Sequence, residues 1–468
     1  MTIPEWPEFS NLPLDPDVED WQQLSARLQK LLAAELAKAG AKPIWQPDAN
    51  AEVMSSEALQ GGLEDWMQHL LSAGFNPAHP GFMAYIPGGG LVTSALADWF
   101  VKTTNRYGTA QFASPYLARL EHRVIQTFAG WVGYDAEAAG VLTTGGSMAN
   151  FTALVTARRA KLPENFLNGV LYCSDQAHHS VMKAANLAGF AKRNVHIVPT
   201  DAQFRMCVQP LREAIESDVA VGLTPFMVVA SAGTTNTGSI DPLAEIAQVC
   251  QRHNLWYHVD GAYGGAFVIT QEGQQKLVGM DQADSITLDP HKSLFLPYGT
   301  GCILVKDREA LITAHEMRGD YMPDLDRDQA HLDPFSLSAE LSREHRGLKI
   351  ALPFMLHGVQ AFREALEEKL VLGRRAWTGL QAIPRLTVLH SPDLTTVAFR
   401  LCDADSTDAR NRELLERVNR RGRVFISGTV LDGEFALRIS VLSHRTHATQ
   451  VDHALEDISL SLAAMFET

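Results

Sequence analysis

The chain has 468 residues, which exceeds the roughly 250 to 300 residues at which a single hydrophobic core stops growing, so two or three structural units are expected. Hydrophobic residues make up 46% of the chain and charged residues 20%, which is ordinary for a soluble globular protein. The formal net charge of -14 and the lack of a Lys/Arg-rich run argue against nucleic acid or an anionic membrane surface as a partner.

The sequence shows no pattern typical of a secretory signal, a membrane span, a disulfide framework or a cysteine metal site. The first residues, MTIPEWPEFSNLPLDP, are acidic and lack a basic start followed by an apolar run, so they do not predict a secretory signal. No apolar stretch reaches the 18 or so residues of a membrane span. The five cysteines form no CxxC pair, which indicates neither a disulfide framework nor a thiolate zinc site. We therefore expect a cytoplasmic protein without a bound metal.

Two amphipathic helices are expected at the amino terminus. Asp15-Pro16 can cap a helix whose apolar positions recur every three or four residues from Val18 until Gly40, and a second helix is expected at about 55 to 73. Two such helices cannot form a core alone. They pack either on the main body or on a second subunit, and the sequence leaves both possibilities open.

The middle of the chain alternates between apolar runs and helical stretches, beginning with helices near 92–105 and 115–132. Strands that alternate with helices predict an α/β fold with a mainly parallel sheet covered on both faces. The seven expected strands are 140–143, 170–174, 195–199, 226–231, 256–259, 285–288 and 302–306.

Beyond residue 350 the pattern changes to that of a smaller α+β unit. A long helix at about 350–370 is followed by expected strands at 386–389, 395–401 and 435–440, with a helix near 407–421. The predicted domains are therefore an amino-terminal helical segment (1–90), a large domain (91–350) and a small carboxy-terminal domain (351–468).

One lysine stands at the end of an expected strand. The run Ser285–Leu288 is stopped by Asp289-Pro290, because proline lacks the N–H that a central strand needs. In α/β sheets ligands bind at strand ends, and a desolvated lysine there can lose its proton and form a Schiff base. The alternative is that Lys292 is a surface lysine after a turn.

A glycine-rich turn, Gly145-Gly146-Ser147, follows another strand and opens a helix. Converging backbone N–H groups at a helix start form an anion site that suits one phosphate. The turn is neither a P-loop nor a dinucleotide fingerprint, since it lacks GK[ST] and GxGxxG. Simple helix capping is the alternative.

Three more strand ends carry polar residues. Asp260 ends an apolar run beside small residues in HVDGAYGG, where a flat ligand with a protonated nitrogen could lie against the carboxylate. His178 and the pair Thr234-Thr235 follow two other runs. Each residue alone has an ordinary structural explanation, and it is their occurrence at successive strand ends that indicates a site.

The ordered segments TTGGSMAN, SDQAHHS, SAGTTNTG, HVDGAYGG and DPHK resemble those of the pyridoxal-phosphate-dependent group II amino-acid decarboxylases, from about Pro77 to Ser440. That family includes aromatic L-amino-acid, glutamate and 2,4-diaminobutyrate decarboxylases. The resemblance implies fold type I, the cofactor pyridoxal 5'-phosphate and an obligate homodimer with its sites at the interface.

The resemblance also implies roles for single residues. Lys292 would bind the cofactor as a Schiff base, Asp260 would keep its pyridine nitrogen protonated, and His178 would stack on one face of the ring. Ala262 would lie against the other face, and Thr235 would support Asp260 or the Schiff-base side. The predicted cofactor-binding residues are Gly145, Gly146, Ser147, His178, Thr235, Asp260, Ala262, Asp289, His291 and Lys292, of which Gly146, Ser147 and His291 would hold the phosphate and Asp289 stands where some relatives have asparagine.

The family's proton donor is harder to place. In the family, a mobile loop before the small domain carries a tyrosine that protonates Cα after CO2 leaves, and here that loop is roughly residues 315–340. Its single tyrosine is Tyr321, while Pro334 and Phe335 stand near the expected place. Either Tyr321 or His331 donates the proton, or the donor is missing and the enzyme releases an aldehyde, as the related aldehyde synthases do.

The substrate is predicted from the segment PGFMAYIPGGG, which resembles the family segment that touches the substrate side chain. Its residues Tyr85, Ile86, Pro87 and Gly88 favour an aromatic side chain. Nearby Asn105, Arg106 and Tyr107 leave glutamate or 2,4-diaminobutyrate open, and Arg438 does not decide.

Other classes of protein fit less well. A transaminase of the same fold usually lacks a histidine directly before the lysine, a serine hydrolase needs a GxSxG elbow, and a zinc enzyme needs clustered ligands such as HExxH. A non-catalytic binding protein on this scaffold would lose Lys292 or Asp260, and both are present. We therefore expect a decarboxylase that converts an L-amino acid, preferably an aromatic one, to its amine and CO2, with a transaminase as the alternative from another class.

Overall fold

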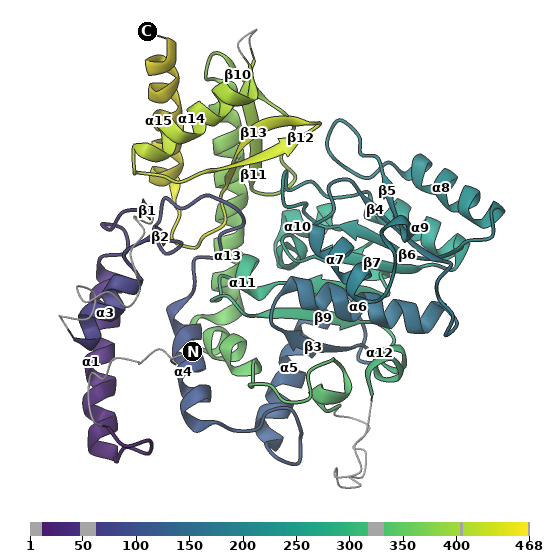
Figure 1. Cartoon of the computed structure of the whole chain (residues 1–468), viewed down its shortest axis with the longest axis horizontal. Coiled ribbons are helices and arrows are strands. Elements are labelled where there is room, and N and C mark those ends of the chain that lie inside the picture. The colour runs from purple at the N-terminus through teal and green to yellow at the C-terminus, as the bar shows by residue number, and fades with distance from the viewer. Residues whose placement is uncertain (1–11, 47–61, 317–331, 403–405, 467–468) are drawn as a thin grey trace, which may run out of the picture. The chain divides into compact units, whose positions relative to one another are not determined.

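The computed structural model describes residues 12–46, 62–316, 332–402 and 406–466 (Figure 1). The chain divides into two compact units. The first comprises Met1–Phe82, Glu416–Phe425 and Arg445–Thr468, and the second comprises Met83–Leu415 and Ile426–His444. The three-domain division expected from the sequence stays a prediction. In the described ranges, no helix has both the length and the apolar character needed to cross a membrane.

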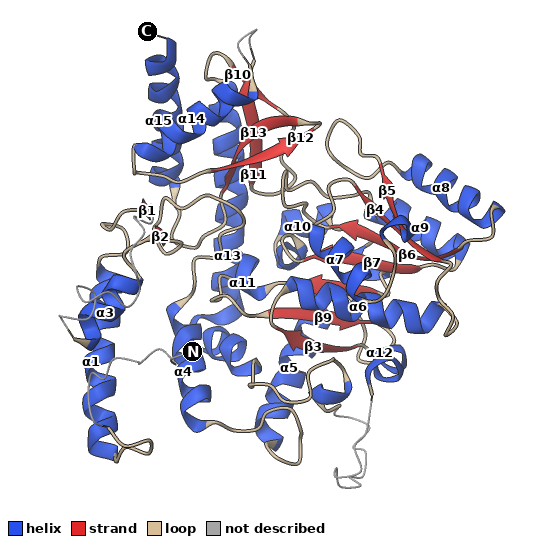
Figure 2. Ribbon diagram, viewed as in Figure 1, coloured by secondary structure: helices blue, strands red, loops and turns tan. Residues whose placement is uncertain are grey.

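A seven-stranded sheet forms the centre of the second unit (Figure 2). Its order is β3-β9-β8-β7-β6-β4-β5, and β9 is antiparallel to both of its neighbours. All seven strands expected from the sequence are found to within two residues, so the prediction of a mainly parallel sheet is confirmed. The strands are β3 (Ala139–Thr143), β4 (Gly169–Ser174), β5 (Val195–Val198), β6 (Thr224–Ser231), β7 (Trp256–Gly261), β8 (Ser285–Leu288) and β9 (Gly301–Val305).

Each face of this sheet packs on its own hydrophobic core. Successive strand residues point to opposite faces, so the neighbours Val228 and Val229 of β6 belong to two different cores. The core that contains Val229 includes apolar residues of α6, α7 and α12, and the core that contains Val228 includes residues of α5, α8, α9 and α13. The sheet is thus buried on both faces, as its near-continuous apolar runs predict.

Of the helices around the sheet, α4 and α5 match the predicted 92–105 and 115–132 to within one residue. The helices of this region are α4 (Val92–Thr104), α5 (Pro115–Trp131), α6 (Gly146–Lys161), α7 (His179–Leu187), α8 (Val208–Ala220), α9 (Leu243–His253), α10 (Gln271–Lys276), α11 (Pro290–Ser293), α12 (Arg308–His315) and α13 (Gly347–Gln381). The last is longer than the predicted 350–370, and it is kinked at Gly358, whose φ is 76°. Glycine accommodates this left-handed conformation without a steric penalty.

A second, antiparallel sheet of the same unit has the order β10-β11-β13-β12. Its strands are β10 (Leu386–Val388), β11 (Thr396–Leu401), β12 (Ser427–Leu431) and β13 (Glu434–Ser440), and α14 (Asp408–Arg420) lies between β11 and β12 in the chain. The sequence analysis missed β12. The dipeptide Asp432-Gly433 joins it to β13 with positive φ at both residues, which is the Asp-Gly signal of a tight hairpin.

The first unit holds α1 (Val18–Ala37), β1 (Trp45–Gln46), α3 (Leu63–Leu70), β2 (Gly74–Phe75) and α15 (Ala448–Phe466). Helix α1 is capped by Asp17, which accepts from the Asp20 N–H at 2.9 Å, so the helix was predicted correctly but its cap is two residues after Asp15. Helix α3 lies within the predicted 55–73, of which residues 55–61 are outside the described ranges. Helix α15 was not predicted.

Candidate active site

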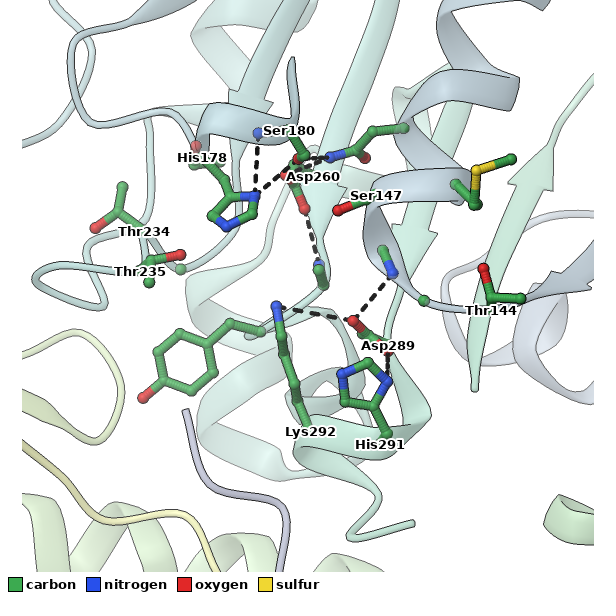
Figure 3. Close-up of a pocket in the computed structure, with 18 residues that line it drawn as sticks. Thr144, Ser147, His178, Ser180, Thr234, Thr235, Asp260, Asp289, His291 and Lys292 are labelled. Carbon is green, nitrogen blue, oxygen red and sulfur yellow. Dashed lines mark hydrogen bonds and ion pairs between the residues drawn. The ribbon is translucent and has the colours of Figure 1, made fainter. Parts of the chain in front are cut away.

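A cavity of about 330 Å³ opens at the end of the central sheet (Figure 3). Its walls come from the segments that follow β3, β4, β6, β7 and β8, which bring together residues up to 148 positions apart, from Thr144 to Lys292. All ten residues predicted to bind a cofactor line it: Gly145, Gly146, Ser147, His178, Thr235, Asp260, Ala262, Asp289, His291 and Lys292. The structure therefore gathers these residues in one place, while their individual roles stay predictions.

Lys292 extends from the single helical turn α11 that follows β8. Its Nζ lies 3.8 Å from Asp289 Oδ2, and its side chain is 19% exposed. His291 Nδ1 lies 2.7 Å from Asp289 Oδ1 and 3.0 Å from the Thr300 carbonyl oxygen. Because both of these neighbours only accept, the proton of the His291 ring belongs on Nδ1. The amine of Lys292 is thus held in a mostly buried pocket, with a paired carboxylate beside it.

The glycine turn forms the start of α6 without a capping side chain, as an anion site requires. Gly145 has a φ of 152°, and a Cβ at Gly146 would stand 3.1 Å from both Ala262 Cβ and Asp289 Oδ2. The Gly146 N–H donates to Asp289 Oδ2 at 3.1 Å. The sequence analysis assigned Gly146 to the phosphate, but its N–H is already used by Asp289. The N–H groups further along the turn remain available to bind a phosphate.

Asp260 is a buried carboxylate at the end of β7, with 7% of its surface exposed. Its Oδ2 accepts from Asn150 Nδ2 at 2.8 Å, and its Oδ1 accepts from the Ala262 N–H at 3.1 Å. Neither donor carries a charge, so these two hydrogen bonds do not neutralise the carboxylate. A bound cation beside it would be stabilised.

His178 is the N-cap of α7, and its Nδ1 accepts from the Ser180 N–H at 3.3 Å. Ser180 Oγ lies 2.8 Å from the same nitrogen. Burial lowers the pKa of His178, an effect that exceeds the opposing influence of Asp260. The ring is therefore neutral at neutral pH, and its second nitrogen faces the open part of the pocket in Figure 3.

The predicted substrate residues Tyr85 to Gly88 do not line the cavity, but they lie next to it. A Cβ at Gly88 would stand 1.9 Å from the His291 carbonyl oxygen, so only glycine fits against α11 there. Tyr85 has a φ of 57° and is 52% exposed, and its N–H donates to Ser427 Oγ at 3.3 Å. The segment is thus fixed at its backbone, while about half of the Tyr85 side chain lies at the surface.

Arg438 connects this segment to the cavity. It is buried on β13, and it donates to Ser427 Oγ at 3.0 Å and to the carbonyl oxygen of the cavity residue Thr235. Burial lowers the pKa of the Arg438 guanidinium to about 10. A cation thus stands between the Tyr85 segment and the cavity wall, which the sequence analysis regarded as uninformative.

Other predicted residues lie elsewhere. Tyr107 donates its hydroxyl to the Leu341 carbonyl oxygen at 3.0 Å and Asn105 caps α4, so both are used structurally, and Arg106 does not line the cavity. Tyr321 and His331 fall outside the described residues. Within the ranges that the structure describes, no group of three or more His, Cys, Asp or Glu side chains could hold a metal ion.

Sequence reasoning overlooked Asn150 and Ser180. Both line the cavity, and Asn150 contacts Asp260 directly. A signal was available, because Asn150 is four residues after Gly146 on α6 and so lies on the same face of that helix.

The sequence profile described as the pyridoxal-dependent decarboxylase conserved domain matches residues 47–402, three quarters of the chain. The chain belongs to this family. An aromatic-L-amino-acid decarboxylase of Bacillus atrophaeus is 33% identical to it over 402 residues, covering 83% of this chain and 84% of that protein. A phenylacetaldehyde synthase of Arabidopsis thaliana is 28% identical over 416 residues, with 85% of each chain covered.

A solved structure supports the same conclusion. The crystal structure of Oryza sativa TDC with PLP and tryptamine superposes with a TM-score of 0.89 at 25% identity, covering 97% of this chain and all of that chain. The enzyme is thus a carboxy-lyase that uses pyridoxal phosphate, with the fold type I architecture expected from the sequence. Its decarboxylase assignment, rather than that of a transaminase, is confirmed.

The residues of the cavity fit this cofactor. Lys292 offers a partly shielded amine for its aldehyde, and the buried carboxylate of Asp260 offers an anion for a protonated ring nitrogen. The uncapped start of α6 offers N–H groups for its phosphate. Ala262, whose side chain is a single methyl group, lines the same cavity and can lie against a flat ring.

Proposed function

We propose that this enzyme decarboxylates an aromatic L-amino acid to the corresponding amine and CO2. The observation that carries the proposal is the 33% identity, over 83% of the chain, to an aromatic-L-amino-acid decarboxylase. The structure adds an apolar segment, Tyr85-Ile86-Pro87, whose backbone is held beside the turn that carries Lys292. An apolar wall of this kind suits an aromatic side chain better than an acidic or cationic one.

Pyridoxal phosphate supplies an electron sink for the pair of electrons left on Cα when CO2 departs. In the proposed mechanism Lys292 would hold the cofactor through its amine. Asp260, which accepts hydrogen bonds from two uncharged donors, would face the ring nitrogen and so strengthen the sink. His178 would lie against the ring as a neutral imidazole. These residues position and polarise the reacting groups.

We propose that Arg438 and Tyr85 shape the substrate subsite together. Ser427 Oγ accepts from both the Arg438 guanidinium and the Tyr85 N–H, so the cation and the aromatic segment are held by the same oxygen. Arg438 also fixes the carbonyl of Thr235 at the cavity wall. A change at Arg438 would therefore disturb both the charge near the substrate and the placement of the apolar wall.

A homodimer is also part of the proposal. Helices α4 and α13 pack together and leave large apolar side chains exposed, namely Leu96, Phe100, Met355 and Leu356, which are 53%, 61%, 79% and 59% exposed. Helix α1 leaves Trp21 and Leu32 at 44% and 52% exposed. Apolar surface of this extent is typical of an obligate interface. The exposed ring of Tyr85 would contact the substrate of the partner subunit's site or of its own.

A cytoplasmic location is proposed from the cysteines. All five are free, and three of them, Cys173, Cys250 and Cys302, are buried. Burial raises the pKa of the Cys173 thiol to about 12, so it does not react readily. Unpaired thiols of this kind are typical of a reducing compartment.

A second candidate function is that of an aldehyde synthase, because the phenylacetaldehyde synthase of Arabidopsis thaliana is 28% identical over 85% of the chain. The two reactions differ in the fate of Cα. A decarboxylase protonates this carbon, whereas the synthase lets it react with oxygen and releases aldehyde, ammonia and hydrogen peroxide. The proton donor decides between them, and the proposed donors Tyr321 and His331 lie outside the described residues.

The test is an assay of the purified enzyme, loaded with pyridoxal phosphate, on L-amino acids with aromatic, acidic and diamino side chains. CO2, amine, aldehyde, hydrogen peroxide and keto acid are measured together. We expect amine and CO2 in equal amounts, with the largest kcat/KM for an aromatic substrate and no peroxide. Peroxide with aldehyde would establish the second candidate, and turnover of glutamate or 2,4-diaminobutyrate alone would overturn the aromatic assignment.

A further inference from the structure

One buried amide joins the two residues that flank the cofactor site. Asn150 is 4% exposed, and its side chain makes four hydrogen bonds. Its Nδ2 lies 2.8 Å from Asp260 Oδ2 and 2.9 Å from Ser180 Oγ. Its Oδ1 lies 2.7 Å from Thr287 Oγ1 and 3.2 Å from His258 Nε2. An amide has two donor hydrogens and two acceptor lone pairs, so this side chain is fully used.

The direction of these bonds is fixed at the Asp260 end. An ionised carboxylate only accepts, so the amide nitrogen of Asn150, and not its oxygen, faces Asp260. The oxygen then faces His258, which must place its proton on Nε2 in order to donate to it. Burial lowers the pKa of His258 to about 4, so the ring is neutral and its Nδ1 carries no proton.

The other end agrees with this direction. The indole of Trp256 can only donate, and its Nε1 lies 2.8 Å from Ser285 Oγ. Ser285 accepts this bond and donates its own proton to His258 Nδ1, 2.8 Å away. All hydrogens in the chain from Trp256 through Ser285 and His258 to Asn150 therefore point the same way, toward the pocket.

The chain continues to His178. Ser180 Oγ accepts from Asn150 Nδ2 and lies 2.8 Å from His178 Nδ1. The Ser180 N–H can only donate, and it approaches the same nitrogen at 3.3 Å, so Nδ1 carries no proton and the Ser180 hydroxyl donates to it as well. With Nδ1 accepting from two donors, the proton of the neutral ring is on Nε2, the nitrogen that faces the open part of the pocket in Figure 3.

We propose that Asn150 is a positioning residue that fixes the tautomer of His178, so that the active-site imidazole presents an N–H, and not a lone pair, to the bound substrate. One amide thereby orients His178 and Asp260 at the same time. His178 acts as a hydrogen-bond donor toward the ligand, and it cannot accept a proton at Nε2 unless the chain of hydrogen bonds is rearranged.

The test uses nuclear magnetic resonance of the ring nitrogens in the full-length chain labelled with ¹⁵N-histidine, with and without pyridoxal phosphate. His178 is assigned by comparison with H178N. In the unmodified chain we expect a protonated Nε2 and an unprotonated Nδ1. In N150D the new side chain has the same size but only accepts from Ser180, so the serine hydroxyl turns away from His178. We expect the ratio of the two tautomers to shift roughly tenfold toward Nδ1–H, as for the loss of one hydrogen bond.

The matched control is T287V, which removes a donor to Asn150 Oδ1 and leaves the Nδ2 side unchanged. It should leave the tautomer of His178 as it is. If N150D does not fold, S180A provides the second measurement. Loss of the hydroxyl donor should raise the pKa of His178, since the donor favours the neutral ring. A proton on Nδ1 in the unmodified chain, an unchanged ratio in N150D, or an unchanged pKa of His178 in S180A would overturn the proposal. None of these results depends on which amino acid is the substrate.

Discussion

The cofactor pocket and the Tyr85–Gly88 segment lie next to each other and are built in opposite ways. Beside the pocket, the polar side chains of Asn150, His258 and Thr287 are buried, and both His258 and Thr287 are hydrogen-bonded to Asn150. In the segment, the backbone is held by Ser427 and α11, whereas the Tyr85 side chain is half exposed. The polar groups beside the pocket are thus paired with one another, whereas the segment exposes about half of the Tyr85 side chain.

Because of this difference, we expect the pocket to determine the reaction and the Tyr85–Gly88 segment to determine which substrate is bound. Buried networks tolerate little change, because an unpaired polar group away from water destabilises the protein by about 1 to 3 kcal/mol. An exposed segment can change its side chains without such a penalty. Relatives with different substrates can thus keep one pocket and vary the wall beside it, and variants of the two regions should affect different kinetic quantities.

The largest effect is expected from K292A, which removes the amine of the pocket. We expect decarboxylation to fall by at least roughly 10³-fold, because the cofactor is no longer held covalently. Borohydride reduction followed by mass spectrometry should attach one pyridoxal phosphate to the unmodified chain and none to K292A. The exposed Lys183 on α7 supplies the control K183A, which should retain both activity and labelling. Covalent labelling of K292A would disprove the assignment.

The second largest effect is expected from D260N, which tests the negative charge of the pocket. The substitution keeps the shape of the side chain and removes the anion that would face the ring nitrogen. We expect kcat to fall roughly 10²- to 10³-fold, the range found when one preorganised electrostatic group is removed from a catalytic site. KM should change far less, because Asp260 does not contact the substrate. A KM effect with an unchanged kcat would place Asp260 in the substrate subsite instead.

F100E tests whether the exposed region extends beyond a single chain. Phe100 is 61% exposed on α4. If this surface forms the homodimer interface, a carboxylate in place of the ring would be buried there without a positive charge beside it. We expect the dimer dissociation constant, measured by analytical ultracentrifugation, to rise roughly 100-fold. Turnover should fall with the dimer fraction, while Lys292 still becomes labelled. An exposed apolar residue of the far helix α8, Val219, gives the control V219E, which should remain dimeric.

R438M tests the connection between the two regions. Methionine fills much of the space but cannot donate to Ser427 or Thr235. We expect KM for the preferred amino acid to rise roughly 10- to 100-fold, the effect of losing charged hydrogen bonds, with a smaller change in kcat. Arg400 on β11, paired with Glu434, supplies the control R400M, whose kinetics should remain those of the unmodified enzyme. An effect on kcat alone would assign Arg438 to the pocket.

Sequence patterns identified many of the residues that line the pocket but not the residues that connect them, for physical reasons. The strands have uninterrupted apolar runs because both faces of the sheet are buried, and their ends are marked by residues such as Asp289-Pro290 and Gly145-Gly146. The partners of Asn150 are distributed over Ser180, His258 and Asp260 and are brought together only by the fold. The role of Arg438 was undecided for the same reason, since Thr235 is 203 residues away.

The smallest effect concerns the pH dependence of the scaffold that carries the pocket. His315 at the end of α12 lies 3.2 Å from Thr156 of α6, the helix whose start forms the glycine turn. Burial lowers the pKa of His315 to about 4, whereas an unfolded histidine titrates near 6.5.

Below pH 6.5 the unfolded chain therefore binds a proton that the folded chain does not, and stability falls as the pH drops from about 6.5 to 4. H315Q keeps a hydrogen-bond donor for Thr156 and removes this proton, so the midpoint temperature of thermal unfolding should depend less steeply on pH. The expected difference is on the order of 1 °C per pH unit in a chain of this size. The exposed His357 gives the control H357Q, which should keep the original slope, and equal slopes for all three proteins would show that His315 titrates alike in the folded and unfolded states.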